Sequence, residues 1–136
     1  MVSCAIPISN EEILTIKEII EDNNGSDCSF QQNFQTLWYT TIDGSEFRIS
    51  FLGNLQIIIS RVEFAIKRKG TLTCLCDFLK KMCLKYSIKE ILIQSTQTKE
   101  IVDFCNKYGF RPCPYASFEL DGIVLGDYSF VVTSDQ

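Results

Sequence analysis

The sequence contains 136 residues, of which 46% are apolar and 22% charged, and its formal net charge is -4. The low net charge and the 12% aromatic content exclude a disordered chain, and the length fits one globular domain, which we expect to span residues 1–136. No apolar run approaches the roughly 20 residues that cross a bilayer, and the start of the chain lacks a secretory signal, so we expect a cytoplasmic protein without a membrane partner.

The cysteine and histidine content restricts the chemistry. Seven cysteines lie along the chain without a framework spacing, which favours free thiols over disulfides. The chain has no histidine, which argues against a bound metal and excludes every mechanism with a histidine base. Any catalysis must therefore use carboxylates, thiols, tyrosines, lysines or backbone dipoles. One cluster of three basic residues in an acidic chain argues against a nucleic-acid partner.

The first half of the chain changes from helical to strand periodicity. A capping box of Ser9 and Glu12, followed by apolar residues at helical spacing, predicts a helix over about residues 10–22. The polar, turn-rich stretch 21–29 then predicts a loop. β-branched and aromatic runs separated by Asp-Gly and Gly-Asn turns predict a three-stranded antiparallel meander over 36–42, 46–51 and 55–66.

The second half predicts a crossover and a hairpin. An apolar stripe from Leu75 to Tyr86 indicates an amphipathic helix that begins near Thr73. The apolar centre of 89–95 is typical of a strand with a parallel neighbour, and a helix over 98–107 stops before Gly109. Two strands around Asp121-Gly122 end the chain. This order predicts an α+β fold with one mixed sheet and helices on both of its faces.

The junction between the long strand and the amphipathic helix is a candidate anion site. Lys67, Arg68 and Lys69 stand directly before Gly70, at the point where the helix is expected to begin. Backbone N–H groups at a helix N-terminus are unpaired and carry the positive end of the helix dipole, so this arrangement suits a phosphate. A solvated, charged turn is the alternative interpretation.

Residues 62–110 resemble the core of the GNAT family of acyl-CoA N-acyltransferases. In that family a strand precedes a phosphate loop of the form Gln/Arg-x-x-Gly-x-Gly/Ala, which is followed by an amphipathic helix, a buried strand and a helix ending like Phe-Tyr-x-x-x-Gly-Phe. The corresponding segments here are VEFAI, KRKGTL, TCLCDFLKKMCLKYS, KEILIQS and IVDFCNKYGF. The resemblance implies a GNAT-like domain that uses acetyl-CoA or another CoA thioester, takes an amine of a small molecule or peptide as acceptor, and exists as a monomer or homodimer.

The resemblance also implies which residues bind the cofactor. The backbone around the end of the long strand would hold the thioester carbonyl, and loop 67–73 would hold the pyrophosphate. Only Gly70 matches the loop pattern strictly, and a threonine stands where the family commonly has an asparagine at the start of the last helix. The cofactor-binding candidates are Val62, Phe64, Lys67, Arg68, Lys69, Gly70, Thr71, Leu72, Thr73 and Thr98.

Two residues are candidates for proton transfer. Regular alternation along the strand places Glu63 on one face with Ile57, Ile59, Arg61 and Ala65, and sets Ile58, Ser60, Val62 and Phe64 on the other. Glu63 lies beside the expected carbonyl site and is the candidate base, whereas an Arg61–Glu63 pair on a solvated sheet face is the alternative.

The candidate acid is Cys105. It stands where many GNAT members have the tyrosine that protonates the departing thiolate, although a buried cysteine more often acts as a small apolar residue. Tyr108 reaches the same place only if the helix is rotated.

Three functions remain open at this stage. The leading prediction is an enzyme that transfers an acetyl or other acyl group from CoA to an amine. The second is a GNAT-like domain that binds CoA or a protein partner without turnover, suggested by Leu72, Thr98 and Cys105. The third is an unrelated α+β interaction domain in which the basic cluster is only a charged turn.

Overall fold

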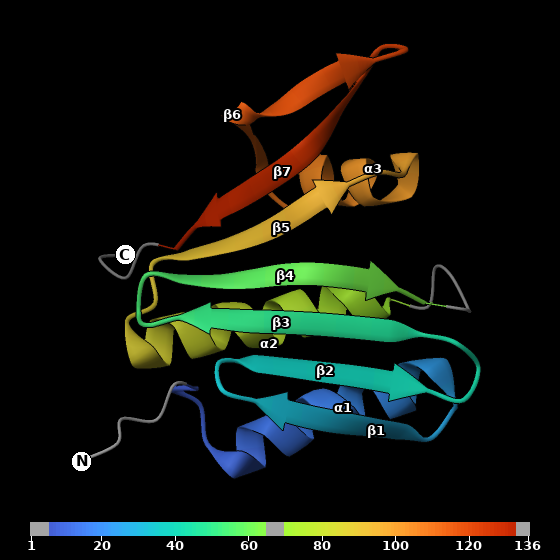
Figure 1. Cartoon of the computed structure of the whole chain (residues 1–136), viewed down its shortest axis with the longest axis vertical. Helices are drawn as coiled ribbons and strands as arrows, with labels where there is room; N and C mark the ends of the chain where they lie inside the picture. The colour runs from blue at the N-terminus through green and yellow to red at the C-terminus, as the bar shows by residue number, and fades with distance from the viewer. Residues whose placement is uncertain (1–5, 65–69, 133–136) are drawn as a thin grey trace.

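The computed structural model describes residues 6–64 and 70–132. The described residues form three helices and seven strands (Figure 1). In chain order these are α1 (Asn10–Asn24), β1 (Cys28–Asn33), β2 (Thr36–Thr41), β3 (Glu46–Leu52), β4 (Gln56–Glu63), α2 (Thr71–Tyr86), β5 (Glu90–Thr96), α3 (Lys99–Lys107), β6 (Arg111–Leu120) and β7 (Ile123–Val131).

All seven strands form one sheet in the order β1-β2-β3-β4-β5-β7-β6. β4 and β5 are parallel, and every other neighbouring pair is antiparallel. The crossover through α2 joins the antiparallel strands of the first half to the C-terminal hairpin (Figure 1). The predicted α+β class with a mixed sheet is confirmed.

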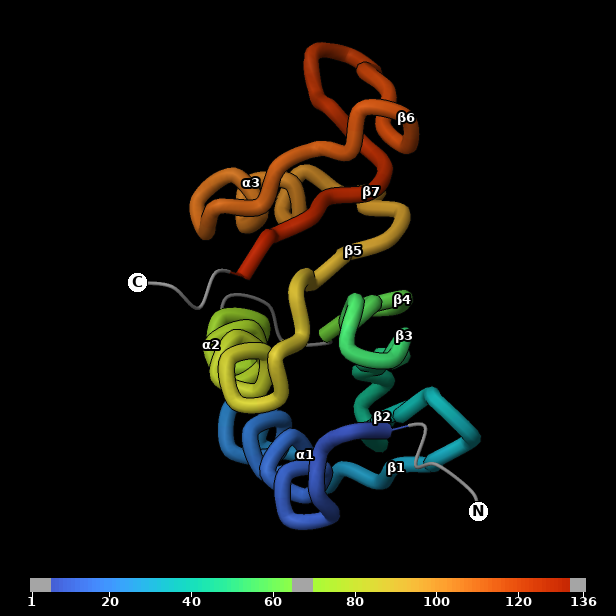
Figure 2. Tube along the Cα trace, turned by 90° about the vertical axis from the view of Figure 1, so that its left-hand side faces the viewer, coloured from blue at the N-terminus to red at the C-terminus, as the bar shows by residue number. Residues whose placement is uncertain are grey.

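The position of the helices differs from the prediction. All three lie on the same side of the sheet, and the other side carries no helix of the described chain (Figure 2). The connection from β4 to β5 through α2 and the connection from β5 to β6 through α3 each join parallel strands. Both connections advance across the sheet in the same direction. Since such crossovers are right-handed, both helices fall on one face. None of these helices is long and apolar enough to cross a membrane.

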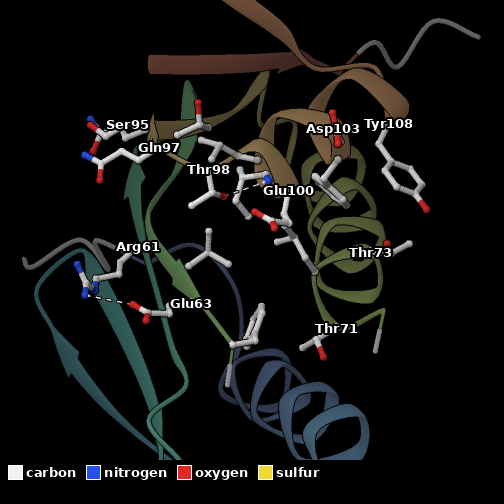
Figure 3. A pocket seen from close by; sticks show the side chains of 18 of the residues that line it. Arg61, Glu63, Thr71, Thr73, Ser95, Gln97, Thr98, Glu100, Asp103 and Tyr108 are labelled. Carbon is white, nitrogen blue, oxygen red and sulfur yellow. Dashed lines mark hydrogen bonds and ion pairs between the residues drawn. The ribbon is translucent and has the colours of Figure 1, made fainter. Parts of the chain in front are cut away.

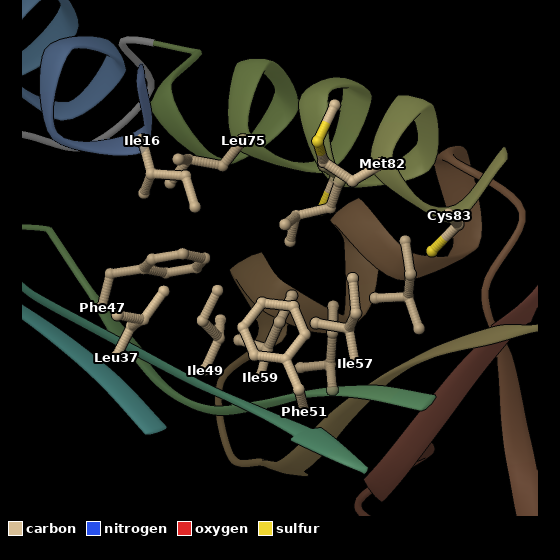
Figure 4. Close-up of a cluster of buried hydrophobic side chains, with 14 of the residues drawn as sticks. Ile16, Leu37, Phe47, Ile49, Phe51, Ile57, Ile59, Leu75, Met82 and Cys83 are labelled. Carbon is tan, nitrogen blue, oxygen red and sulfur yellow. The ribbon is translucent and has the colours of Figure 1, made fainter. Parts of the chain in front are cut away.

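The core lies between this helical layer and the sheet (Figure 4). Apolar residues from α1 and α2 pack against the inward-facing residues of β2, β3 and β4, and most of them are completely buried. Because the sheet is covered on one face only, β2 and β3 alternate between buried apolar residues and more exposed, mostly polar residues. The labelled members of the cluster in Figure 4 are Ile16, Leu37, Phe47, Ile49, Phe51, Ile57, Ile59, Leu75, Met82 and Cys83.

β1 is the one strand that the sequence did not predict. It occupies part of the stretch that was expected to be a loop, and it pairs in register with β2 at the edge of the sheet. Its inward residues are Cys28, which is buried, and Phe30, whose ring lies 5.4 Å from that of Tyr39. The polar sequence CSFQQN carries little strand signal by itself, so the tertiary contacts with β2 decide its conformation.

Candidate functional site

β4 and β5 separate at their carboxyl ends. Their parallel pairing runs from Gln56 opposite Glu90 to Ile59 opposite Ile93 and goes no further. At this point the register also shifts between β3 and β4, and between β5 and β7, where Ser95 adopts a φ of 53°. Because such bulges bend a strand and increase its twist, the two strands diverge and leave a cleft of about 700 Å³.

The bulge in β4 corrects the expected alternation. Ser60 is the extra residue, because Ile59 pairs with Ile49 and Arg61 pairs with Arg48. Val62 and Phe64 therefore join Ile57 and Ile59 on the helix side, where the Phe64 ring lies 6.4 Å from that of Phe47. The prediction that grouped Arg61 and Glu63 with Ile57 and Ile59 was wrong, since a single inserted residue reverses the side-chain phase.

Both faces of the sheet line the cleft. Figure 3 shows Arg61 and Glu63, with Ser95 and Gln97 beyond them, on one flank. Thr71 and Thr73 of α2 and Tyr108 at the end of α3 lie on the opposite flank. The cleft therefore has one mouth toward the helices and a second mouth on the helix-free side of the sheet.

The mouth on the helix side contains the N-terminus of α2. Helices α1 and α3 begin with side-chain caps, from Ser9 and Thr98 respectively. The N-cap residue of α2 is Gly70, whose φ of 77° is left-handed, and no side chain of the described residues caps the helix. The first N–H groups of a helix have no partner within the helix, so this end keeps unpaired donors and a partial positive charge at the cleft.

A buried hydrogen-bond chain fixes this helix end. The Thr71 hydroxyl donates to Asn24 Oδ1 (2.7 Å), and Asn24 Nδ2 donates to the Ser45 hydroxyl (2.8 Å). All three residues are buried, and they tie the start of α2 to the end of α1 and to the β2–β3 turn. The Thr71 hydroxyl is thus engaged inside the protein, and the remaining donors at this helix end are the backbone N–H groups and the hydroxyl of Thr73, which lines the cleft.

Most of the predicted cofactor-binding residues meet at this cleft. Val62, Phe64, Gly70, Thr71, Leu72, Thr73 and Thr98 all line it, as does the candidate base Glu63. The hydroxyl of Thr98 accepts from the Ile101 N–H (3.3 Å) as the cap of α3. The predicted phosphate-binding cations Lys67, Arg68 and Lys69 lie outside the described residues.

Cys105 lies elsewhere. Its side chain is fully buried against the sheet and is absent from the cleft lining. Burial raises the pKa of its thiol to about 12, so the group is both inaccessible and protonated. The neighbouring aromatic pair Phe104 and Tyr108, with ring centres 4.7 Å apart, lines the cleft instead. Tyr108 lines the cleft without any rotation of the helix, because α3 ends at Lys107 and the backbone of Tyr108 is no longer helical.

The Arg61–Glu63 pair expected as the alternative is present. Arg61 Nη2 lies 3.4 Å from Glu63 Oε1, and Arg61 Nε lies 2.6 Å from Glu46 Oε1. The Glu63 side chain is 61% exposed, and it also lines the cleft. A weak exposed pair of this kind contributes little to stability, so it leaves the carboxylate available for proton transfer.

Sequence reasoning missed several residues at the site. Ser95 and Gln97 line the mouth on the helix-free side, and Asn24 accepts the hydrogen bond from Thr71 that fixes the start of α2. The bulge that positions Ser95 leaves no signal in the sequence, whereas Asn24 stands in an Asn-Asn-Gly helix end that was interpreted only as a turn. Residues 6–64 and 70–132 contain no cluster of three potential metal ligands.

Several solved structures have a similar arrangement of elements, and two of the following three are described as acetyltransferases. Ard1 from Thermoplasma volcanium superimposes with a TM-score of 0.51 at 16% identity, over 93% of this chain and 95% of that chain. IAA acetyltransferase from Bacillus cereus gives 0.51 at 14% identity, over 72% and 79% of the two chains. A structure from Chromobacterium violaceum described as a probable GNAT-family acetyltransferase gives 0.52 at 12% identity, over 73% and 60%.

The chain has the GNAT fold. Comparison of the sequence with protein-family models and with curated proteins gives no match. At these identities the structural likeness shows the fold alone.

Proposed function

We propose that the protein is an N-acyltransferase that moves an acetyl or other acyl group from acetyl-CoA, or a related CoA thioester, to an amine of a small molecule or peptide. The observation that carries the proposal is the cleft between the separated ends of β4 and β5. It has an uncapped helix N-terminus at one mouth and a carboxylate, Glu63, on its other flank.

The cleft suits an extended CoA thioester. Phosphates would bind the N–H groups of residues 70–73, where the helix dipole and the unpaired donors favour an anion. Beyond Ile59 the edge of β4 that faces β5 has no strand partner, so the backbone of Val62 and Phe64 is free to bond the pantetheine arm and the thioester carbonyl. Donors positioned at that carbonyl stabilise the oxyanion that forms on attack.

The acceptor amine would enter from the helix-free side. Glu63 removes a proton from the amine directly or through one water, the nitrogen bonds to the thioester carbon, and the C–S bond breaks with the electron pair on sulfur. Cys105 is left without a part in this step, since its thiol does not reach the cleft. The departing thiolate takes its proton from solvent in the open cleft.

Calorimetric titration with acetyl-CoA under reducing conditions tests the proposal. We expect micromolar binding in the wild type and a loss of at least about tenfold when Lys67, Arg68 and Lys69 are changed together to Gln. A matched triple variant at the exposed residues Lys81, Lys89 and Arg111 removes the same charge away from the cleft and should bind normally. Absence of binding at millimolar acetyl-CoA would contradict the proposal.

An amine panel then tests turnover. Products should be detected by mass spectrometry, because the seven cysteines would react with thiol reagents that measure released CoA. Acylated amine supports the transferase. Tight acetyl-CoA binding without any acylated product would instead support the alternative of a CoA-binding domain without turnover.

A further inference from the structure

The helix-free face beside the cleft carries a connected set of charged side chains. Trp38 Nε1 donates to Glu46 Oε2 (2.6 Å), and Arg61 Nε donates to Glu46 Oε1 (2.6 Å). Arg61 also pairs with Glu63, as described above. Both oxygens of Glu46 are therefore occupied, and Arg61 is shared between two carboxylates.

Arg48 is the exception in this set. It stands opposite Arg61 in the β3–β4 register, and its guanidinium lies over the Trp38 ring at 5.5 Å from the ring centre. Its Nε donates to the hydroxyl of Ser60 (3.1 Å), a residue that lines the cleft. Among the described residues no carboxylate pairs with Arg48.

This geometry prepares the Arg48 guanidinium for an anion. The indole face and the Ser60 hydroxyl hold the side chain in one orientation, so little rotamer freedom is lost when a ligand binds. With Nε engaged, the terminal nitrogens keep donors that can bind a carboxylate. A lysine lacks this planar group and its stacking on the indole.

We propose that the acceptor carries a carboxylate as well as an amine, and that Arg48 binds the carboxylate while the amine is presented to Glu63. The two residues belong to adjacent rungs of one sheet face, since Glu46 pairs with Glu63 and Arg48 with Arg61. These rungs are about 7 Å apart along the strands, which is the length of about two extended residues, so a short peptide spans them more fully than a single amino acid does. This inference rests on the proposed acyl transfer and names its acceptor class.

Fluorescence of Trp38 tests the carboxylate site without turnover, because this is the protein's only tryptophan. The probes are N-acetylglycine and its uncharged match N-acetylglycinamide. We expect N-acetylglycine alone to change the emission, with affinity about tenfold weaker in Arg48→Gln and intermediate in Arg48→Lys. Arg111→Gln, an exposed site on β6, removes the same charge and should bind like the wild type. Equal response to both probes, no response, or an unchanged affinity in Arg48→Gln would overturn the proposal.

Kinetics with matched acceptors separates this inference from the proposed function. Glycine and glycylglycine should be acylated with a KM at least about tenfold below those of their amides, and Arg48→Gln should remove that difference by raising KM while kcat stays within about twofold. Whichever of glycine and glycylglycine has the lower KM indicates the distance between the amine and the carboxylate that the site accommodates. Faster turnover of the amides would contradict this inference but not the proposed acyl transfer. Failure of acetyl-CoA to bind in calorimetry would contradict the proposed acyl transfer itself.

Discussion

The same secondary-structure elements behave differently at the two ends of the sheet. At the closed end, residues 56–59 of β4 pair with residues 90–93 of β5, and the α1 N-terminus meets the α2 C-terminus. At the open end, residues 60–63 of β4 diverge from residues 94–96 of β5, and the uncapped start of α2 faces the gap. A seven-residue strand such as β5 thus contributes to the core in its first half and to the candidate site in its second half.

The difference lies in how polar groups are satisfied. At the closed end Gln56 donates to Glu90 across the parallel pair, and Glu12 bonds to Lys85 and Tyr86 between the helices. At the open end backbone donors and the Glu63 carboxylate face solvent. A ligand can replace water at such groups when a rigid scaffold holds them in place. The closed end therefore provides the rigidity that the open end needs.

The largest expected effect is on the closed end. Ile59 is almost fully buried and forms the last parallel rung with Ile93, so Ile59→Ala leaves a cavity in the core. We expect the free energy of unfolding to fall by about 2–5 kcal/mol in urea denaturation. Val62→Ala removes similar atoms from a partly buried position beyond the rung and should cost less than about half as much. Equal losses would show that the two ends are not distinct in packing.

Glu63→Gln tests the open end. We expect kcat for acyl transfer to fall by at least about 100-fold, equivalent to about 2.7 kcal/mol of barrier, while the unfolding free energy changes by less than about 0.5 kcal/mol because the side chain is largely exposed. Glu119→Gln, an exposed carboxylate on β6, is the matched control and should leave kcat unchanged. Cys105→Ala should keep its kcat within a few fold and lose stability instead, which is the reverse pattern. A rate that survives Glu63→Gln would remove Glu63 as the base.

The closed end was largely predictable from the sequence, and the open end was not. Periodicity identified the helices, the apolar strand centre 89–95 and its parallel neighbour, because burial imposes a regular pattern of apolar residues. The open end depends on one inserted residue, Ser60, and on a left-handed Ser95, neither of which departs from ordinary strand composition. The family resemblance therefore found several residues that line the cleft, but regular alternation grouped those of β4 on the wrong faces.

The position of Cys105 illustrates a second limit. The sequence motif placed it correctly on α3, where Cys105 and Val102 are the buried residues. Motif alignment cannot tell whether a shorter side chain still reaches the cleft. Only the packing of α3 against the sheet shows that the thiol is buried.

Asn24 is buried beside the start of α2 at the open end, and its substitution should give an intermediate effect. Asn24→Ala removes the amide that accepts from the buried Thr71 hydroxyl at the start of α2 and donates to the buried Ser45 hydroxyl. We expect a loss of about 2 kcal/mol in unfolding free energy, together with a KM for acetyl-CoA several fold higher at nearly constant kcat. Asn23→Ala is the neighbouring control, because the Asn23 amide donates to the Ile19 carbonyl within α1 and accepts only a long, exposed bond of 4.0 Å from the Cys74 thiol. If acetyl-CoA affinity is unchanged in Asn24→Ala, the helix end does not hold the ligand.

Glu12 should produce the smallest effect, and it should depend on pH. Burial acts to raise the pKa of this carboxyl, but the hydrogen bonds from Lys85, Ser9 and Tyr86 outweigh it and lower the pKa from 4.5 to about 2. Since the folded-state pKa is depressed, the contribution to stability is complete above pH 4.5 and is lost as the pH falls toward 2. Because Lys85 is largely exposed, we expect only about 1 kcal/mol.

Comparison of the wild type with Glu12→Gln isolates this contribution. Glu21 and Asp43 also have lowered pKa values, and both titrate in the same way in the two proteins, so their effects cancel in the difference. The difference in unfolding free energy, measured in urea from about pH 6 to about pH 2.5, should shrink steadily below pH 4.5. A difference that stays constant over this range would mean that the closed end is held by packing of α1 on α2 rather than by the charged hydrogen bonds of Glu12.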